Sequence, residues 1–120
     1  MRRLSLALLI LCCLTADPVR SQPRRVVLVT AERFSFTPSE IVVDAGEEFE
    51  LRLKSDDTAH GFRIAGTTIN LVIPKRGYKT ASTTLRLTEP GRYTFECSRM
   101  CGAGHNFMRG VLVVRAPAGH

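Results

Sequence analysis

The feature that most constrains the fold is a repeated alternation of apolar and polar residues. Residues 48–54 and 92–97 both alternate in this way, with Phe49, Leu51 and Leu53 as the apolar set of the first segment. A period of two places successive side chains on opposite faces of an extended chain. Both segments are therefore predicted to be half-buried β-strands, and no segment shows a convincing amphipathic helical period.

Further short strands are predicted on either side. Residues 84–88 repeat the alternation, and the β-branched runs 26–29 and 111–114 suit strands inside a sandwich. Turn-forming residues separate the segments, at 37–39, 44–46, 54–58, 74–77 and 89–91. About seven or eight short strands with regular turns predict an all-β, Greek-key β-sandwich. The 120 residues are enough for one such domain.

The first 21 residues predict a secretory signal peptide. Arg2 and Arg3 precede an apolar stretch, residues 4–14, and small and polar residues follow it. The stretch is shorter than the roughly 20 apolar residues that a stable membrane-spanning helix needs. We expect cleavage after Ser21, with Ala16 as the competing position, and an uncleaved signal would act as a loose anchor. The domain would then comprise residues 22–120, in the periplasm or secreted.

Charge and motif content argue against two large classes of function. The formal charge is +6 for the whole chain and about +4 without residues 1–21, and the basic residues are dispersed. With only eight aromatic residues, most at core-like positions, the sequence does not predict nucleic-acid binding. It contains no credible Ser-His-Asp set, paired-carboxylate motif or glycine-rich phosphate loop, so an enzyme is not expected.

The densest chemistry lies near the C-terminus. Cys97 and Cys101 are followed at short intervals by His105 and Met108, and His60 stands far upstream at the predicted start of a strand. Thiols, imidazoles and a thioether form a soft donor set, which selects copper, above all Cu(I). A Greek key can bring the upstream histidine and the late loop to the same end of a sandwich, which predicts a copper site there.

A disulfide is the simpler alternative for this cluster. Once residues 1–21 are removed, Cys97 and Cys101 are the two remaining cysteines, in a compartment where thiols tend to oxidise. A structural disulfide requires neither His105 nor Met108, so their presence favours metal binding. Phe62 and Phe107 are predicted to pack around the site and keep it dry.

These residues make the sequence resemble a cupredoxin, and most closely the CuA-type copper domain of cytochrome c oxidase subunit II and nitrous oxide reductase. The family pattern is Cys-x3-Cys-x3-His-x2-Met, with an earlier histidine across a long gap. The matching positions here are Cys97, Cys101, His105, Met108 and His60. The similarity extends over residues 57–113 and is weaker before Glu40.

The resemblance implies a binuclear copper centre. Cys97 and Cys101 would bridge two copper ions as thiolates, while His60 would ligate one ion and His105 the other. Two bridging sulfurs would delocalise one electron over both ions, so that gaining or losing it alters each bond only slightly. Such a centre transfers electrons quickly. Each histidine is expected to be oriented by a hydrogen bond from its other ring nitrogen.

Two weaker donors are implied as well, together with some departures from the oxidase pattern. Met108 and the backbone carbonyl of Arg99 would be weak donors on opposite sides. Arg99 stands where the oxidase pattern has a glutamate, and the chain has neither tryptophan nor the pair of transmembrane helices. We therefore expect a free-standing, monomeric secreted domain rather than a working oxidase subunit.

Three functions remain open from the sequence. The first is a one-electron carrier with a CuA-type centre, and the second is a protein that stores or delivers copper. The third is a mononuclear blue or red cupredoxin that uses His60, Cys101, His105 and Met108, with Cys97 spare. Two copper ions per chain against one would separate the first from the third, and readily lost Cu(I) would mark the second.

A redox protein is the expected partner of an electron carrier. Basic residues occur in segments that flank the predicted copper site, and if they share one face they would attract an acidic partner and repel a basic cytochrome. These residues are Arg63, Lys75, Arg76, Arg99 and Arg109.

Overall fold

A computed structural model describes residues 16–18 and 23–117 of the chain. Most of the predicted signal peptide, residues 1–21, and the predicted cleavage site after Ser21 lie outside the described residues. Over the ranges that are described, no helix combines the length and the apolar character needed to cross a membrane.

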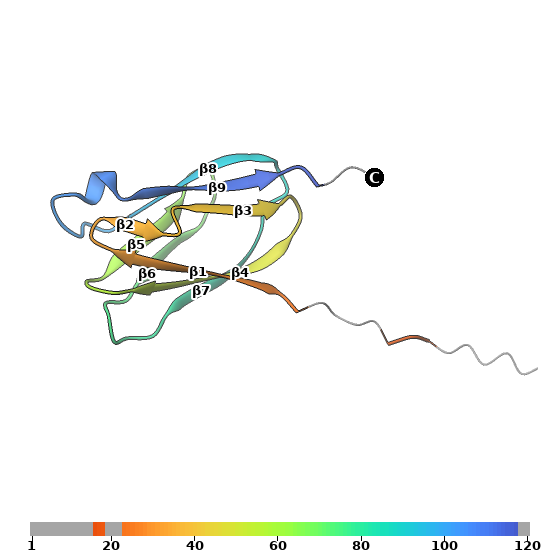
Figure 1. Cartoon of the computed structure of the whole chain (residues 1–120), viewed down its shortest axis with the longest axis horizontal. Coiled ribbons are helices and arrows are strands. Elements are labelled where there is room, and N and C mark those ends of the chain that lie inside the picture. Colours follow the sequence, from red (N-terminus) through yellow and green to blue (C-terminus); the bar gives the residue numbers. More distant parts are fainter. Residues whose placement is uncertain (1–15, 19–22, 118–120) are drawn as a thin grey trace, which may run out of the picture.

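The described residues form two curled β-sheets that face each other (Figure 1). One sheet has the strand order β2-β1-β4-β7 and the other β3-β9-β8-β5-β6. The pairs β1–β4 and β3–β9 are parallel, whereas the other neighbouring strands of the two sheets pair antiparallel. The strands are β1 (Arg25–Glu32), β2 (Ser35–Thr37), β3 (Glu40–Asp44), β4 (Glu48–Ser55), β5 (His60–Ile64), β6 (Asn70–Ile73), β7 (Ala81–Arg86), β8 (Gly91–Glu96) and β9 (Arg109–Arg115). The predicted all-β sandwich in a single domain is confirmed.

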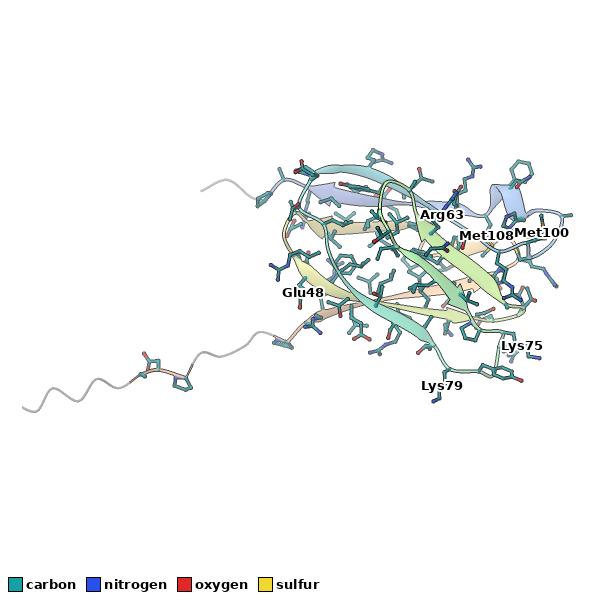
Figure 2. All side chains as sticks on the ribbon, turned by 180° about the vertical axis from the view of Figure 1, so that it is seen from behind. Glu48, Arg63, Lys75, Lys79, Met100 and Met108 are labelled. Atoms are coloured by element: carbon teal, nitrogen blue, oxygen red, sulfur yellow. The ribbon has the colours of Figure 1, made fainter. Side chains whose placement is uncertain are left out.

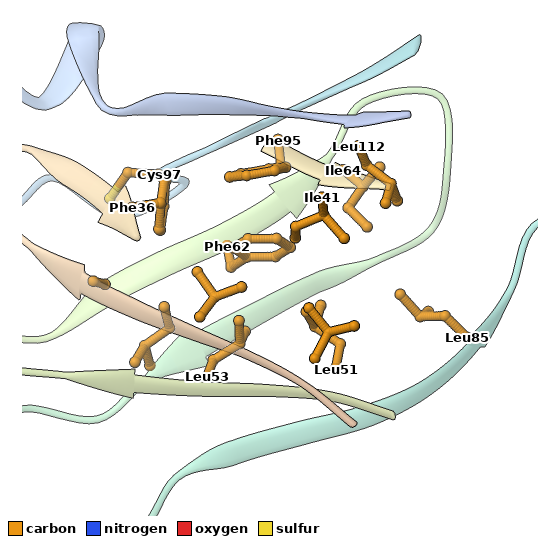
Figure 3. Close-up of a cluster of buried hydrophobic side chains, with 14 of the residues drawn as sticks. Phe36, Ile41, Leu51, Leu53, Phe62, Ile64, Leu85, Phe95, Cys97 and Leu112 are labelled. Carbon is orange, nitrogen blue, oxygen red and sulfur yellow. The ribbon is translucent and has the colours of Figure 1, made fainter. Parts of the chain in front are cut away.

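The core lies between the two sheets and contains the residues that the alternation predicts. Phe49, Leu51 and Leu53 of β4 are all buried, while their neighbours in sequence are not. Phe62 and Phe95 stack with their ring centroids 4.9 Å apart, and the ring of Phe36 meets both edge-on (Figure 3). Cys97 lies beside Phe36 at one end of this core, so the apolar interior continues directly to the predicted metal site (Figure 3).

One predicted strand ends earlier than expected. The alternation predicts a strand over residues 84–88, but β7 spans Ala81–Arg86. The antiparallel ladder between β4 and β7 ends at the pair Glu48 and Arg86. Leu87 lies beyond it, and its carbonyl accepts a hydrogen bond of 2.8 Å from the backbone N–H of Gly46 in the turn between β3 and β4. Pairing with a neighbour, rather than periodicity, sets the end of this strand.

Strand directions bring the predicted ligands to one end of the sandwich. β5 begins at His60 and runs antiparallel to β8, with Arg63 opposite Glu96. The start of β5 therefore lies beside the end of β8, where the loop of residues 97–108 begins. This loop contains a short 3-10 helix, η1 (His105–Phe107), and leads into β9 (Figure 1).

Candidate metal centre

Sulfur and nitrogen atoms of five predicted ligands converge at this end of the sandwich. The Sγ atoms of Cys97 and Cys101 are 3.6 Å apart. The Cys97 sulfur lies 4.0 Å from Nδ1 of His60, and the Cys101 sulfur lies 3.7 Å from Nδ1 of His105. The Cys101 sulfur is also 3.8 Å from Sδ of Met108. Each thiol thus has a histidine of its own.

The sixth predicted donor is a backbone atom in the same cluster. The carbonyl oxygen of Arg99 lies 3.0 Å from the Sγ atom of Cys97. A backbone hydrogen bond of 3.0 Å from the N–H of Cys97 to the carbonyl of Met108 closes the loop. The fold therefore brings together all six atoms that the sequence analysis singled out.

The two sulfurs are not bonded to each other, and their separation is compatible with joint binding of a metal. Both cysteines are free, and their 3.6 Å separation greatly exceeds the S–S bond length of about 2.05 Å. Two metal–sulfur bonds of about 2.3 Å can span up to about 4.6 Å, so both sulfurs can reach one ion. The ligand atoms of His60, Cys97 and Cys101 also lie within 4.8 Å of one another, and all three residues are buried. This soft, buried donor set fits copper.

His60 is held in place by Asp57, a residue that the sequence analysis treated only as part of a turn. The Nε2 atom of His60, which is fully buried, lies 2.7 Å from Oδ1 of Asp57. Burial acts to raise the pKa of Asp57, but hydrogen bonds from the backbone N–H of Arg33 and from His60 together hold it below its usual value. An ionised Asp57 accepts the proton of Nε2, which leaves the lone pair on Nδ1, the atom that faces Cys97.

The turn between β1 and β2 also contacts the site, and the sequence analysis missed it. Nε of Arg33 donates a hydrogen bond of 2.9 Å to the carbonyl of Cys101, 68 residues away in the chain. The ring of Phe34 lies over the loop, where a Cβ atom on Gly104 would come within 2.4 Å of it. No local sequence pattern marks such distant contacts. For Asp57 there is a local indication, since a carboxylate three residues before a candidate histidine ligand is a plausible hydrogen-bond partner.

The two phenylalanines predicted to shield the site differ in burial. Phe62 is buried in the core, as expected. The prediction for Phe107 is wrong, because 84% of its surface is exposed on η1. Met100 is similarly exposed, and it lies at the same end of the sandwich as the buried Met108 (Figure 2). The chain turns after Cys101, where the N–H of His105 bonds the carbonyl of Gly102, and none of the residues of the following helix η1 is buried.

A polar cleft of about 290 Å³ opens beside Cys97 and His105. It is lined by arginines from two strands, Arg63 of β5 and Arg109 of β9, with Glu96 of β8 beside them. Arg63 forms an ion pair with Glu96 and lowers the pKa of that carboxyl group. His105 is the most exposed of the side-chain ligand candidates, since it is only half-buried and borders the cleft, whereas the other four are buried.

The thiol of Cys101 is strongly biased toward its neutral form when no metal is bound. Burial raises its pKa to about 11, with a further contribution from the neighbouring Cys97 and a smaller opposing one from the charge of Arg33. Since metals bind thiolates, loading the site must displace the Cys101 proton.

The copper-free protein should consequently lose stability in alkaline solution. The unfolded chain releases the Cys101 proton near its ordinary pKa of 9.0, whereas the folded chain retains it up to about pH 11. Raising the pH through this window favours unfolding, by about 2 kcal/mol at a pH of about 10.5. Urea denaturation of the wild type and of Cys101→Ser at several pH values measures this contribution as the difference between their slopes. Parallel slopes for the two proteins would contradict it.

The fold and the site define a known class of protein. The chain belongs to the cupredoxin family, since the family profile described as "Cupredoxin-like domain" matches residues 4–114. Within it, the sequence is homologous to the soluble domain of cytochrome c oxidase subunit II. Cytochrome c oxidase subunit 2 of Thermus thermophilus is 35% identical over 105 residues, which cover 83% of this chain.

Two further comparisons agree with this relationship. Nitrous-oxide reductase of Ralstonia nicotianae is 32% identical over 111 residues, or 85% of this chain. The crystal structure of the periplasmic domain of subunit II of cytochrome oxidase of Bradyrhizobium japonicum superimposes with a TM-score of 0.70 at 15% identity. That match covers 81% of this chain and 88% of the other, and it supports the fold.

The relatives are longer proteins to different degrees. The match spans 76% and 61% of two Thermus thermophilus subunit 2 sequences, but only 17% of the nitrous-oxide reductase. The part shared with these relatives is the cupredoxin-like domain.

Proposed function

We propose that this domain is a copper-binding one-electron carrier of the periplasm or the cell exterior. One observation carries the proposal: two buried thiols lie 3.6 Å apart, each with its own histidine within about 4 Å. Copper bound there would supply a Cu(I)/Cu(II) couple in a site that is already formed by the fold. Kinship with oxidase subunit II and with nitrous-oxide reductase supports the same role.

The proposed centre is binuclear and of the CuA type. Cys97 and Cys101 would bridge the two ions, and His60, His105, Met108 and the carbonyl of Arg99 would complete the set. In a mononuclear site that uses Cys101, the sulfur of Cys97 would be spare. Yet this sulfur is buried and faces both the Nδ1 atom of His60 and the Arg99 carbonyl, which favours a role in binding.

The domain would serve an oxidase or reductase without being the catalyst. All the candidate ligands come from the protein, and the pocket beside them is a polar surface cleft rather than an enclosed substrate cavity. Electrons would pass through His105, which borders this cleft together with Cys97 and is the more exposed of the two. The role of the domain would be to exchange single electrons with a separate redox protein.

Copper retention during redox cycling tests electron transfer against copper delivery. The copper-loaded domain is reduced with ascorbate and reoxidised with ferricyanide, in the presence of a chelator specific for Cu(I). We expect reversible uptake of one electron per centre and full retention of copper over several cycles. Transfer of the copper to the chelator on the first reduction would instead favour delivery or storage.

The basic residues near the cleft predict how the domain finds its partner. Arg63 and Arg109 line the cleft, and the loop that carries Lys75 and Arg76 lies at the same end, because the N–H of Arg76 bonds the carbonyl of Asp57. We expect electron exchange with an acidic cytochrome to slow as ionic strength rises, and exchange with a basic cytochrome to accelerate. Stopped-flow mixing of the reduced domain with each oxidised cytochrome measures both rates.

Arg109→Gln should weaken the salt dependence, and Arg92→Gln is its matched control. Arg92 is an exposed residue near the opposite end of β8, paired with Val113, so its loss should leave the dependence nearly unchanged. Rates that are independent of salt with both cytochromes would show that this face does not steer association.

A further inference from the structure

Arg33 contacts both Asp57, which holds His60, and the loop that carries Cys101, although it lies far from both in the sequence. Its backbone N–H donates a hydrogen bond of 2.8 Å to Oδ2 of Asp57, whose other oxygen holds His60. Its side chain donates a hydrogen bond of 2.9 Å to the carbonyl of Cys101. One residue in the turn between β1 and β2 thus contacts the support of His60 and the loop that carries Cys101.

Phe34 reinforces this connection by packing. Its ring lies so close to the loop that a Cβ atom would come within 2.8 Å of it at Gly102 and within 2.4 Å at Gly104. Glycine at both positions lets the loop lie flat against the ring. The loop from Cys101 to His105 is therefore held on one side by the ring of Phe34 and at its start by the guanidinium group of Arg33.

We propose that Arg33 is a positioning residue of the copper centre, which fixes the Cys101 loop relative to His60 and raises the reduction potential through its charge. The effect on the reduction potential, the electrostatic half of the proposal, rests on the proposed function. The fixing of the Cys101 loop, the structural half, concerns the protein even without copper. Arg33 itself lies outside residues 57–113, the range that contains the ligand pattern and both of its contacts, Asp57 and Cys101.

The sign of the effect of Arg33 on the reduction potential follows from the change in charge of the centre on reduction. Reduction adds one negative charge to the centre, so a fixed positive charge nearby stabilises the reduced form. Asp57, which bonds to the backbone of Arg33, has the opposite effect because its carboxylate stabilises the oxidised form. The guanidinium group of Arg33 offsets that carboxylate, and its removal leaves the negative charge uncompensated.

Hydrogen exchange of the copper-free protein tests the structural half. Arg33→Met removes the donor and the charge from an exposed side chain, and Arg52→Met on β4, which breaks an ion pair with Glu50, is the matched control. The amides of His105 and Met108 are hydrogen-bonded within the loop and report on its order. We expect them to exchange about tenfold faster in Arg33→Met, since hydrogen bonds from charged groups contribute substantially to local stability. Equal exchange in the two variants would overturn the structural half.

Redox titration of the copper-loaded protein tests the electrostatic half. Arg33→Met should lower the reduction potential, Arg52→Met should leave it unchanged, and Arg33→Lys should keep it near the wild-type value. Lysine retains the charge but not the planar Nε donor, so its loop amides should still exchange faster than in the wild type. A potential that is equal in wild type and Arg33→Met would overturn the charge effect.

The two measurements also separate this inference from the proposed function. If the wild-type protein takes up no copper, the proposed function fails, while the exchange rates still decide whether Arg33 orders the loop. If copper is bound but Arg33→Met alters neither exchange nor potential, the copper centre stands and Arg33 has no role in positioning it.

Discussion

The Cys97→Ser variant is expected to bind at most one copper ion per chain, against two in the wild type. The Cys97 sulfur lies 3.6 Å from the sulfur of Cys101, 4.0 Å from His60 and 3.0 Å from the carbonyl of Arg99, so it is central to the cluster. A serine hydroxyl remains protonated and is a hard donor, which suits copper poorly. Metal analysis after gel filtration gives the stoichiometry, and competition with a chelator gives the affinity.

The loss of affinity should exceed the roughly 10–100-fold that follows the removal of an outer partner of a ligand. Ser98→Ala is the matched control, because Ser98 is the next residue and its exposed hydroxyl donates a hydrogen bond to Asn70, which is not a ligand candidate. This control should retain two copper ions. A wild type and a Cys97→Ser variant that each bind one ion with equal affinity would show that Cys97 is spare and the site mononuclear.

The Gly61→Ala variant is expected to lose both stability and copper affinity. A Cβ atom at Gly61 would lie 2.2 Å from the hydroxyl oxygen of Ser98, 2.8 Å from the backbone nitrogen of Arg99 and 2.9 Å from that of Ser98. Two of these are backbone atoms of the segment that follows Cys97, so the whole segment must move. Overpacking of this kind typically costs about 1–3 kcal/mol, and the shift displaces the Cys97 sulfur and the Arg99 carbonyl.

Gly46→Ala separates the loss of copper from a general loss of stability. Gly46 has a φ of +80° in the turn between β3 and β4, and a Cβ atom there meets nothing within 4 Å. Alanine at this position should cost about 1 kcal/mol through backbone strain while copper affinity is retained. Thermal denaturation of the copper-free variants and chelator competition measure the two properties. Equal copper affinity in Gly61→Ala and Gly46→Ala would show that β5 does not support the ligand segment.

The sequence predicted the fold well where side-chain periodicity is strong. The alternation in β4 and β8 correctly identified buried Phe49, Leu51 and Phe95. It extended β7 too far, because the strand ends where its ladder with β4 ends, and this depends on a partner distant in the sequence. The short strands β2, β3 and β6 have too few residues for a period to be recognised.

The candidate site was predictable to the extent that its residues are close in the sequence. Spacing alone grouped the residues from Cys97 to Met108, and the strand start at His60 was correctly predicted. The contact between Asp57 and His60 spans only three residues and could have been predicted locally. The hydrogen bonds from Arg33 to Asp57 and to Cys101 join segments that are distant in the sequence, so no local pattern records them. Phe107 was misplaced for the same reason, since the conformation of the loop decides which side chains turn outward.

The most direct test is electron paramagnetic resonance of the copper-loaded wild type, together with its copper content. Our account predicts two copper ions per chain and, in the mixed-valence form, a seven-line hyperfine pattern from one electron shared by two equivalent copper nuclei. One copper ion with a four-line pattern, or a reduced protein that takes up no copper, would contradict joint binding by Cys97 and Cys101.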